Sequence, residues 1–326
     1  CVSVGVEMEG VKGLIVGSMN GATLIEPTRA VPLNNALEDA VTKVAAAELA
    51  VCWELTGQIY DRLNDLRYTL EVVTALDEMC ARARYSNHMA GKRPRFIEQP
   101  PSSASAPADN NGSKPMKVSI RRLSHPLLLH ASLARKPSQT PIPPPVPVDF
   151  SITEGTLAVN ITGPNTGGKT ASLKALGLAI VMAKAGLYIP AVEADIPWFD
   201  AVYADIGDEQ SLQANLSTFS SHLRAILAIR LESTAESLVL LDELGTGTDP
   251  VEGAALSLAL IKAFARPGPG GSKLLVTTTH HSQVKALKYS DKYAEFGCEN
   301  ACVEFDEEKL APTYKILWGI PGRSNA

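Results

Sequence analysis

The chain has 326 residues, of which 45% are hydrophobic and 20% are charged. This composition is typical of a globular protein of about two domains, and it excludes a fully disordered or fibrous chain. The net charge of −5 gives no overall positive field that would favour nucleic acid. Residues 82–136 differ, because they hold eleven Lys and Arg residues against only Glu98 and Asp109, so a local contact with a polyanion is possible there.

The five cysteines are an odd number and match no zinc-binding spacing. They predict a reducing, intracellular compartment and neither structural disulfides nor a bound metal at the thiols. No apolar run approaches the roughly 20 residues that a membrane helix needs, so we expect no membrane segment. Because the chain begins at Cys1 and not at Met, we interpret it as a fragment whose compartment, an organelle included, stays open.

The N-terminal part is predicted to hold strands followed by long helices. Valines alternate over residues 2–6, and the turn signal Asn20-Gly21 separates apolar runs at residues 14–16 and 22–25. Residues 34–90 carry apolar side chains three and four apart, which predicts two helices with a break near Gly57. A continuous helix of this length would be an arm of about 85 Å, but an antiparallel helical pair is the favoured interpretation.

Residues 94–149 contain 12 of the 22 prolines and are predicted to be a linker or surface insertion. Within them, residues 118–130 have the composition of an ordered island. Residues 141–147 are expected to be extended polyproline. A passive spacer is the favoured interpretation, and a peptide-recognition motif is the alternative.

From residue 156 onward, strands and helices alternate at short intervals. Apolar runs at residues 157–161, 202–206, 238–241 and 274–278 predict buried strands, and residues 301–305 and 313–317 predict a hairpin. The predicted fold class is therefore α/β with a mostly parallel sheet, preceded by a long helical segment. The predicted domains are residues 1–93, 94–149 and 150–326.

A phosphate-binding loop is predicted directly after the strand at residues 157–161. The pattern GxxxxGK[ST] is matched in full by Gly163, Pro164, Asn165, Thr166, Gly167, Gly168, Lys169 and Thr170. A strand before this pattern and a helix after it are the context in which backbone N–H groups cradle phosphates. We expect Lys169 to reach the β and γ phosphates of ATP and Thr170 to ligate Mg²⁺.

Two carboxylates follow the apolar strand at residues 238–241. Asp242 is placed to hold the Mg²⁺ ion, and Glu243 is placed to orient and deprotonate the water that attacks the γ-phosphate. Many strands end in an acidic residue by chance, but this pair after a complete phosphate loop favours hydrolysis. The Asp-Glu pair is typical of an ATPase of the ABC kind.

Three further elements carry candidate residues. His280 follows the strand at residues 274–278, where a histidine can sense the γ-phosphate, whereas its neighbour His281 has no comparable role. The Gly-rich loop GTGTDP comes after Glu243 and contains Asp249. Ser217 opens the sequence STFSSH, which by itself predicts no more than a helix N-cap.

Together these motifs resemble the ATPase domain of the MutS family. The matching sequences are GPNTGGKT, DIGDEQS, STFSSH, LLDELGTGTDPVEGAAL, TTTHHSQ and GIPGRSNA. STFSSH and GRSNA are similar to the family's second, recombination-suppressing branch, which is usually associated with a small nuclease (Smr) domain. Upstream, NGATLIEP, LNNAL and ARARY are similar to that branch's lever helices.

The resemblance implies an ATP-dependent, Mg²⁺-dependent DNA-binding ATPase that acts as a homodimer on mismatched or branched DNA and recombination intermediates. Each ATP site would be shared between subunits: Ser217 and the loop around Asp249 would approach the γ-phosphate from the partner. The residues that would serve ATP within one subunit are Asn165, Lys169, Thr170, Asp242, Glu243 and His280. Any nuclease activity would lie outside this chain, and the adenine-stacking residues, expected just before Phe150, stay unassigned.

Two alternative functions are open at this point. The second MutS branch is similar to factors that act on stalled or collided ribosomes, so a ribosome could replace DNA as the client. The nucleotide-binding subunit of a membrane transporter would share the phosphate loop, the carboxylate pair and the histidine. Such a subunit would, however, need an LSGGQ-type signature in place of STFSSH.

Overall fold

The computed structural model describes residues 5–8, 11–19, 22–97, 116–134, 142–207, 215–266, 268–289, 296–306, 308–309 and 311–322. The chain divides into two compact units, Cys1–Glu78 and Met79–Ala326.

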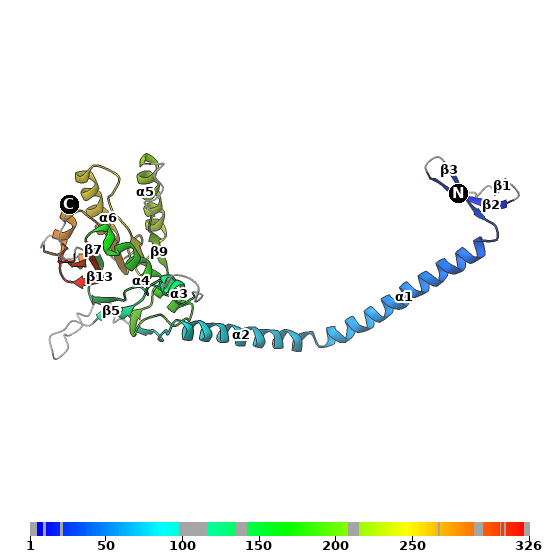
Figure 1. Cartoon of the computed structure of the whole chain (residues 1–326), viewed down its shortest axis with the longest axis horizontal. Helices are drawn as coiled ribbons and strands as arrows, with labels where there is room; N and C mark the ends of the chain where they lie inside the picture. Colours follow the sequence, from blue (N-terminus) through cyan, green and yellow to red (C-terminus); the bar gives the residue numbers. More distant parts are fainter. Residues whose placement is uncertain are drawn as a thin grey trace. The chain divides into compact units, whose positions relative to one another are not determined.

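The first unit begins with a three-stranded antiparallel sheet, which Figure 1 shows leading into helix α1. Its strands are β1 (Gly5–Met8), β2 (Val11–Met19) and β3 (Ala22–Pro27). The predicted hairpin is the β2–β3 pair. Its turn residues Asn20 and Gly21 lie outside the described residues, as does most of the strand predicted at residues 2–6.

Two long helices follow, α1 (Val31–Asp61) and α2 (Leu63–His88). The break is at Arg62, whose N–H bonds to the carbonyl of Ile59 at 3.1 Å, and not near Gly57, which stays inside α1. No residue of α1 is buried, and its apolar side chains, such as Leu37 and Leu55, are more than half exposed. The favoured antiparallel pair is therefore wrong within residues 31–78, because paired helices would cover these side chains.

A six-stranded sheet forms the centre of the second unit. Its strand order is β13-β12-β7-β11-β10-β9, parallel throughout except for the antiparallel β12–β13 pair. These strands are β7 (Ala158–Thr162), β9 (Val202–Asp205), β10 (Leu238–Leu241), β11 (Leu274–Thr278), β12 (Cys298–Asp306) and β13 (Ala311–Trp318). The mostly parallel sheet predicted from the apolar runs is confirmed.

A second sheet has the order β4-β8-β5-β6, with strands β4 (Arg95–Ile97), β5 (Met116–Leu123), β6 (Val148–Thr153) and β8 (Glu193–Pro197). Strands β4 and β5, together with helix α3 (Pro126–Leu133), belong to the stretch predicted as a linker or insertion. The ordered island expected at residues 118–130 corresponds to β5 and the start of α3. The rest of that stretch, residues 98–115 and 135–141, lies outside the described residues.

Side chains that alternate along the central strands build two cores. On β10, Leu238 and Leu240 face a core shared with helix α4 (Lys169–Lys184) and the second sheet, whereas Val239 and Leu241 face the opposite core. That opposite core includes side chains of α5 (Asn215–Glu232), α6 (Pro250–Phe264) and α7 (Ser282–Lys285).

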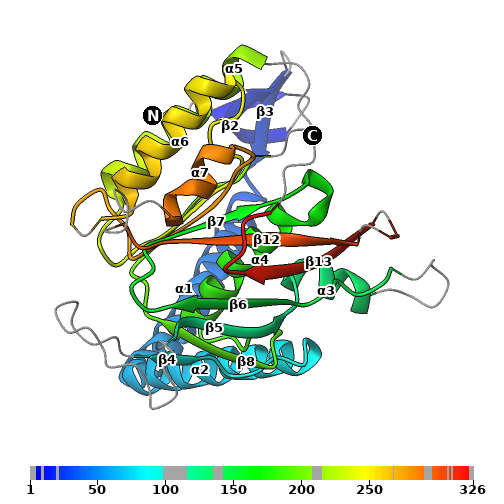
Figure 2. The same ribbon diagram turned by 90° about the vertical axis from the view of Figure 1, so that its left-hand side faces the viewer.

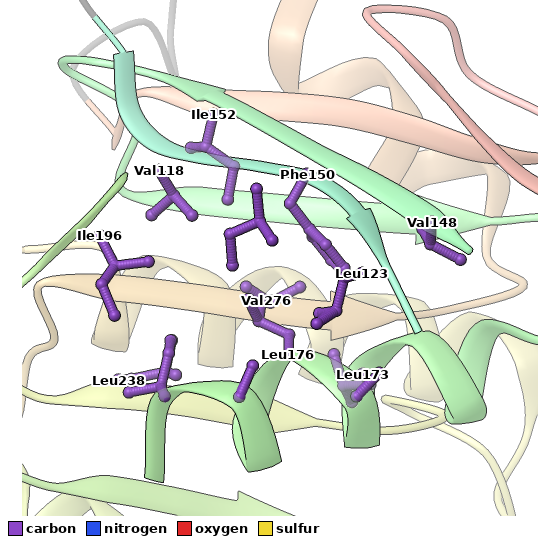
Figure 3. Close-up of a cluster of buried hydrophobic side chains, with 14 of the residues drawn as sticks. Val118, Leu123, Val148, Phe150, Ile152, Leu173, Leu176, Ile196, Leu238 and Val276 are labelled. Carbon is purple, nitrogen blue, oxygen red and sulfur yellow. The ribbon is translucent and has the colours of Figure 1, made fainter. Parts of the chain in front are cut away.

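Figure 2 shows these three helices on one side of β7 and β12, with β5, β6 and β8 on the other. In Figure 3, Phe150 and Ile152 of β6 point toward Leu173 and Leu176 of α4.

Candidate functional site

The predicted site residues follow the carboxyl ends of neighbouring parallel strands. The phosphate loop follows β7, Asp242 and Glu243 follow β10, and His280 follows β11. Since β7, β11 and β10 are adjacent and parallel, these ends meet at one edge of the sheet. Ligands of open α/β sheets bind in the crevice outside such an edge.

The phosphate loop has a backbone that glycine makes possible. Gly163 has a φ of +131°, and a Cβ atom there would come within 2.4 Å of the Cγ2 atom of Val303. Residues Asn165–Gly167 form a short 3₁₀ helix, and Gly168 stands at the N-cap of α4 in the left-handed region. Among the side chains that the structure describes, none caps α4. The first-turn N–H groups and the helix dipole therefore suit an anion such as phosphate.

Lys169 is buried, with only 2% of its surface exposed, and its ammonium lies inside the loop. It donates to the carbonyls of Gly163 at 2.8 Å and Pro164 at 3.0 Å. The Nζ atom is also 3.5 Å from the Nε2 atom of His280. The structure thus brings the predicted cation and the predicted γ-phosphate sensor together over the loop.

One hydroxyl holds both carboxylate residues, and sequence reasoning missed it. Thr278, the last residue of β11, donates from its Oγ1 atom to the Oδ1 atom of Asp242. The same Oγ1 accepts the backbone N–H of Glu243 at 2.8 Å. Glu243 has a φ of +49°, which is uncommon for a residue other than glycine and is typical of functional sites. Thr278 therefore fixes the direction of one carboxylate and the strained backbone of the other.

The loop after Glu243 is fastened by His281, the histidine to which the sequence assigned no role. Its Nε2 atom lies 3.1 Å from the carbonyl oxygen of Gly245, and because a carbonyl only accepts, Nε2 is the protonated nitrogen. Ser257 donates to the carbonyl of Leu244 at 3.0 Å. Further along, the carboxylate of Asp249 caps α6 by accepting the N–H of Val251 at 2.9 Å. The start and the end of this loop are thus both held by hydrogen bonds.

The remaining predicted residues are placed by their elements. Thr170 lies in the first turn of α4, Thr166 in the short 3₁₀ helix, and Ser217 in the first turn of α5. The side chains of Asn165 and Ser217 lie outside the described residues. A hydroxyl at Thr170 and a carboxylate at Asp242 form the oxygen donor set that Mg²⁺ prefers, so these residues fit the predicted ion.

Part of the positive charge of residues 82–136 is neutralised in the fold by carboxylates from another strand. Arg95 makes a bidentate pair with Asp195, with both contacts at 2.6 Å, and Arg121 lies 3.5 Å from Glu193. Strand β8 therefore compensates two of the charges that could contact a polyanion. Lys117 of the same segment is buried and donates to backbone carbonyls.

Within the described residues, no helix is long and apolar enough to cross a membrane. The four cysteines among those residues, Cys52, Cys80, Cys298 and Cys302, are free thiols. Burial raises the pKa of the Cys298 thiol to about 11, which keeps it protonated and unreactive at neutral pH.

Comparison with known proteins matches these motifs to one family. A family profile described as MutS domain V covers residues 159–325. A protein named Endonuclease MutS2 from Synechocystis sp. is 44% identical over 95% of this chain. Proteins of the same name from Halalkalibacterium halodurans and Shouchella clausii are 41% and 39% identical, each over 98% of the chain. The chain spans 37% of the length of each of these three relatives. It belongs to the MutS family, whose ATPase domain it carries, and within that family to the second branch.

Proposed function

We propose that this chain hydrolyses ATP at a site shared between two copies and uses the nucleotide to switch contacts with DNA. The observation that carries the proposal is the convergence at one sheet edge: the phosphate loop, Lys169 beside His280, and the two carboxylates held by Thr278. A catalytically idle Gly-rich turn would not need a buried lysine or a strained acidic residue next to it.

In this mechanism Lys169 exchanges its two loop carbonyls for the β and γ phosphate oxygens. His280 contacts the γ-phosphate, and Glu243 accepts a proton from the attacking water. Thr278 supports that step because it fixes the Glu243 backbone. Bound Mg²⁺, held by Thr170 and Asp242, would neutralise charge that develops on the phosphates.

The partner copy supplies the rest of the site. Ser217 in the first turn of α5 and the loop that ends at Asp249 would approach the γ-phosphate of the facing subunit. Because Asp249 caps its own α6, we assign the loop backbone, and not this carboxylate, to the partner's phosphate. ATP then favours the closed dimer by mass action, since it binds both faces.

Mismatched or branched DNA is the proposed client. The relatives named Endonuclease MutS2 support a nucleic-acid substrate, and any nuclease activity would lie outside this chain. The full-length protein should therefore retain branched DNA in a pull-down and release it when ATP is added. Retention of collided ribosomes with no retention of DNA would replace this client with the ribosome.

Subunit mixing tests the shared site. In the full-length protein, Ser217→Ala and Lys169→Ala should each abolish hydrolysis, and mixing the two should restore one working site per heterodimer. Glu243→Gln should keep ATP bound and stop turnover, because an amide orients water but cannot accept its proton. It should also increase the ATP-dependent dimer in sedimentation. No recovery on mixing, together with no ATP-dependent dimer, would contradict the shared site.

A further inference from the structure

A histidine of α5 is seated on the end of strand β9. The Nδ1 atom of His222 lies 3.0 Å from the Oδ2 atom of Asp205, the last residue of β9. A carboxylate that is ionised only accepts, so His222 donates from Nδ1. The Asp205 side chain is 15% exposed and the His222 side chain is 40% exposed. The contact therefore joins a mostly buried carboxylate at the end of β9 to a partly exposed imidazole on α5.

The other edge of the imidazole lies close to the space that a side chain at position 207 would fill. A Cβ atom built on Gly207 would lie 2.9 Å from the Cε1 atom of His222 and 3.2 Å from its Nε2 atom. Residue 207 therefore has to be glycine for the ring to keep its place. Asp205 thus binds one edge of the ring and Gly207 leaves room for the other, and we call this arrangement the His222 seat.

The His222 seat connects the carboxylate segment of the subunit to the helix that carries Ser217. On one side, the carbonyl of Asp205 accepts the N–H of Asp242 at 2.9 Å, so the seat touches the carboxylate segment of its own subunit. On the other side, α5 carries Ser217 five positions before His222. Positions five apart lie about 140° apart around a helix axis. Anchoring position 222 therefore fixes the rotation of α5 about its axis, and with it the placement of position 217 on the helix.

We propose that His222 and Asp205 are positioning residues for catalysis in trans: they set α5 so that Ser217 is presented to the nucleotide of a second copy of this chain. The proposal rests on the shared site described above. It adds that the presenting helix is fixed, through Asp205, to the carboxylate segment of its own subunit.

A heterodimer with one working site tests this in the full-length protein. One subunit carries Lys169→Ala and only presents α5, and the other carries Ser217→Ala and only holds ATP. Placing His222→Ala in the presenting subunit should lower kcat at least about tenfold and leave the KM for ATP unchanged, because a small misplacement of a catalytic group is costly. The same substitution in the subunit that holds ATP should change kcat by less than about twofold.

Two further variants separate positioning from general damage to the fold. His222→Asn keeps a donor near the position of Nδ1 and should recover most of the activity. Gly207→Ala keeps His222 but displaces its ring, so it should reproduce the loss only in the presenting subunit. Arg224→Ala, an exposed change on the same helix, is the matched control, and all variants should melt within a few degrees of one another.

The outcomes are distinguishable. Equal losses from either placement, or no loss in the presenting subunit, would overturn the positioning role while leaving the shared site intact. No recovery when the parental Lys169→Ala and Ser217→Ala subunits are mixed would overturn the shared site and this inference with it.

Discussion

Burial of Lys117 makes folding stability depend on pH, in the direction opposite to that of a lysine whose pKa is raised by an ion pair. Its side chain is 5% exposed, and its Nζ atom donates to the carbonyls of Thr156 at 2.8 Å and Lys273 at 2.6 Å. Burial, reinforced by the nearby charge of Lys273, lowers the pKa of Lys117 from 10.5 to about 8. Between these values the unfolded chain binds a proton that the native protein does not.

The free energy of unfolding should therefore rise with pH in this window. At about 1.4 kcal/mol per pH unit, the full interval from 10.5 to about 8 corresponds to about 3 kcal/mol. Most of it, about 2 to 3 kcal/mol, falls between pH 7 and pH 10. Below about pH 8 the lysine is charged in both states, so the native state is destabilised by the full free energy of burying the ammonium.

The substitution Lys117→Met removes the titrating group and keeps a similar volume. Urea unfolding of both proteins, followed by tryptophan fluorescence from pH 7 to pH 10, gives the difference in unfolding free energy at each pH. Titrating groups that do not interact with Lys117 cancel in that difference, and the loss of two hydrogen bonds adds a constant; among the neighbours that interact with it, Lys273 has the largest effect. A difference that stays flat within about 0.5 kcal/mol would show that the buried ammonium is not destabilised.

Three other changes have defined outcomes. Lys169→Ala should weaken ATP binding by roughly a hundredfold in a fluorescence titration, because it removes a buried charge facing the phosphates, and undiminished affinity would refute its role. Thr278→Val should lower kcat and destabilise the protein by about 2 kcal/mol, whereas Thr278→Ser should retain both properties; equal effects of the two variants would dismiss the hydroxyl. Reversing Arg93 and Arg122 should reduce the slope of log DNA affinity against log salt by about 0.9 per lost phosphate contact, and an unchanged slope would remove the basic segment from the DNA contact.

The central strands could be predicted because each is a short apolar run followed by a recognisable motif. Strand β6 was missed although its burial alternates, because the prolines before it suggested an extended spacer. Strand β8 was missed because Glu193 and Asp195 look like surface residues, while in the fold they pair with arginines from β4 and β5. The helix break at Arg62 has no Gly or Pro to announce it.

The site divides in the same way. The phosphate loop is one contiguous stretch of sequence, and so is the carboxylate pair. The residue types and spacing within each stretch are therefore enough to predict it. Thr278 acts on residues 35 and 36 positions earlier, and His281 acts on Gly245, 36 positions earlier. Such contacts form only when parallel strands bring their ends together. The sequence around a threonine or histidine does not reveal which distant residue it will bond. Only the order of strands in the sheet could have pointed to them.

At Glu243, the residue that would best stabilise the left-handed backbone differs from the residue that the proposed chemistry needs. A non-glycine residue held in this region costs about 1 kcal/mol, and glycine would adopt it without that cost. A selection that rewards only thermal stability would therefore favour glycine at position 243 and discard the carboxylate. Natural variants of this chain that carry Glu243→Gly would be expected to fold well and bind nucleotide while failing to turn it over, so abundance in the cell would be a misleading guide to their activity.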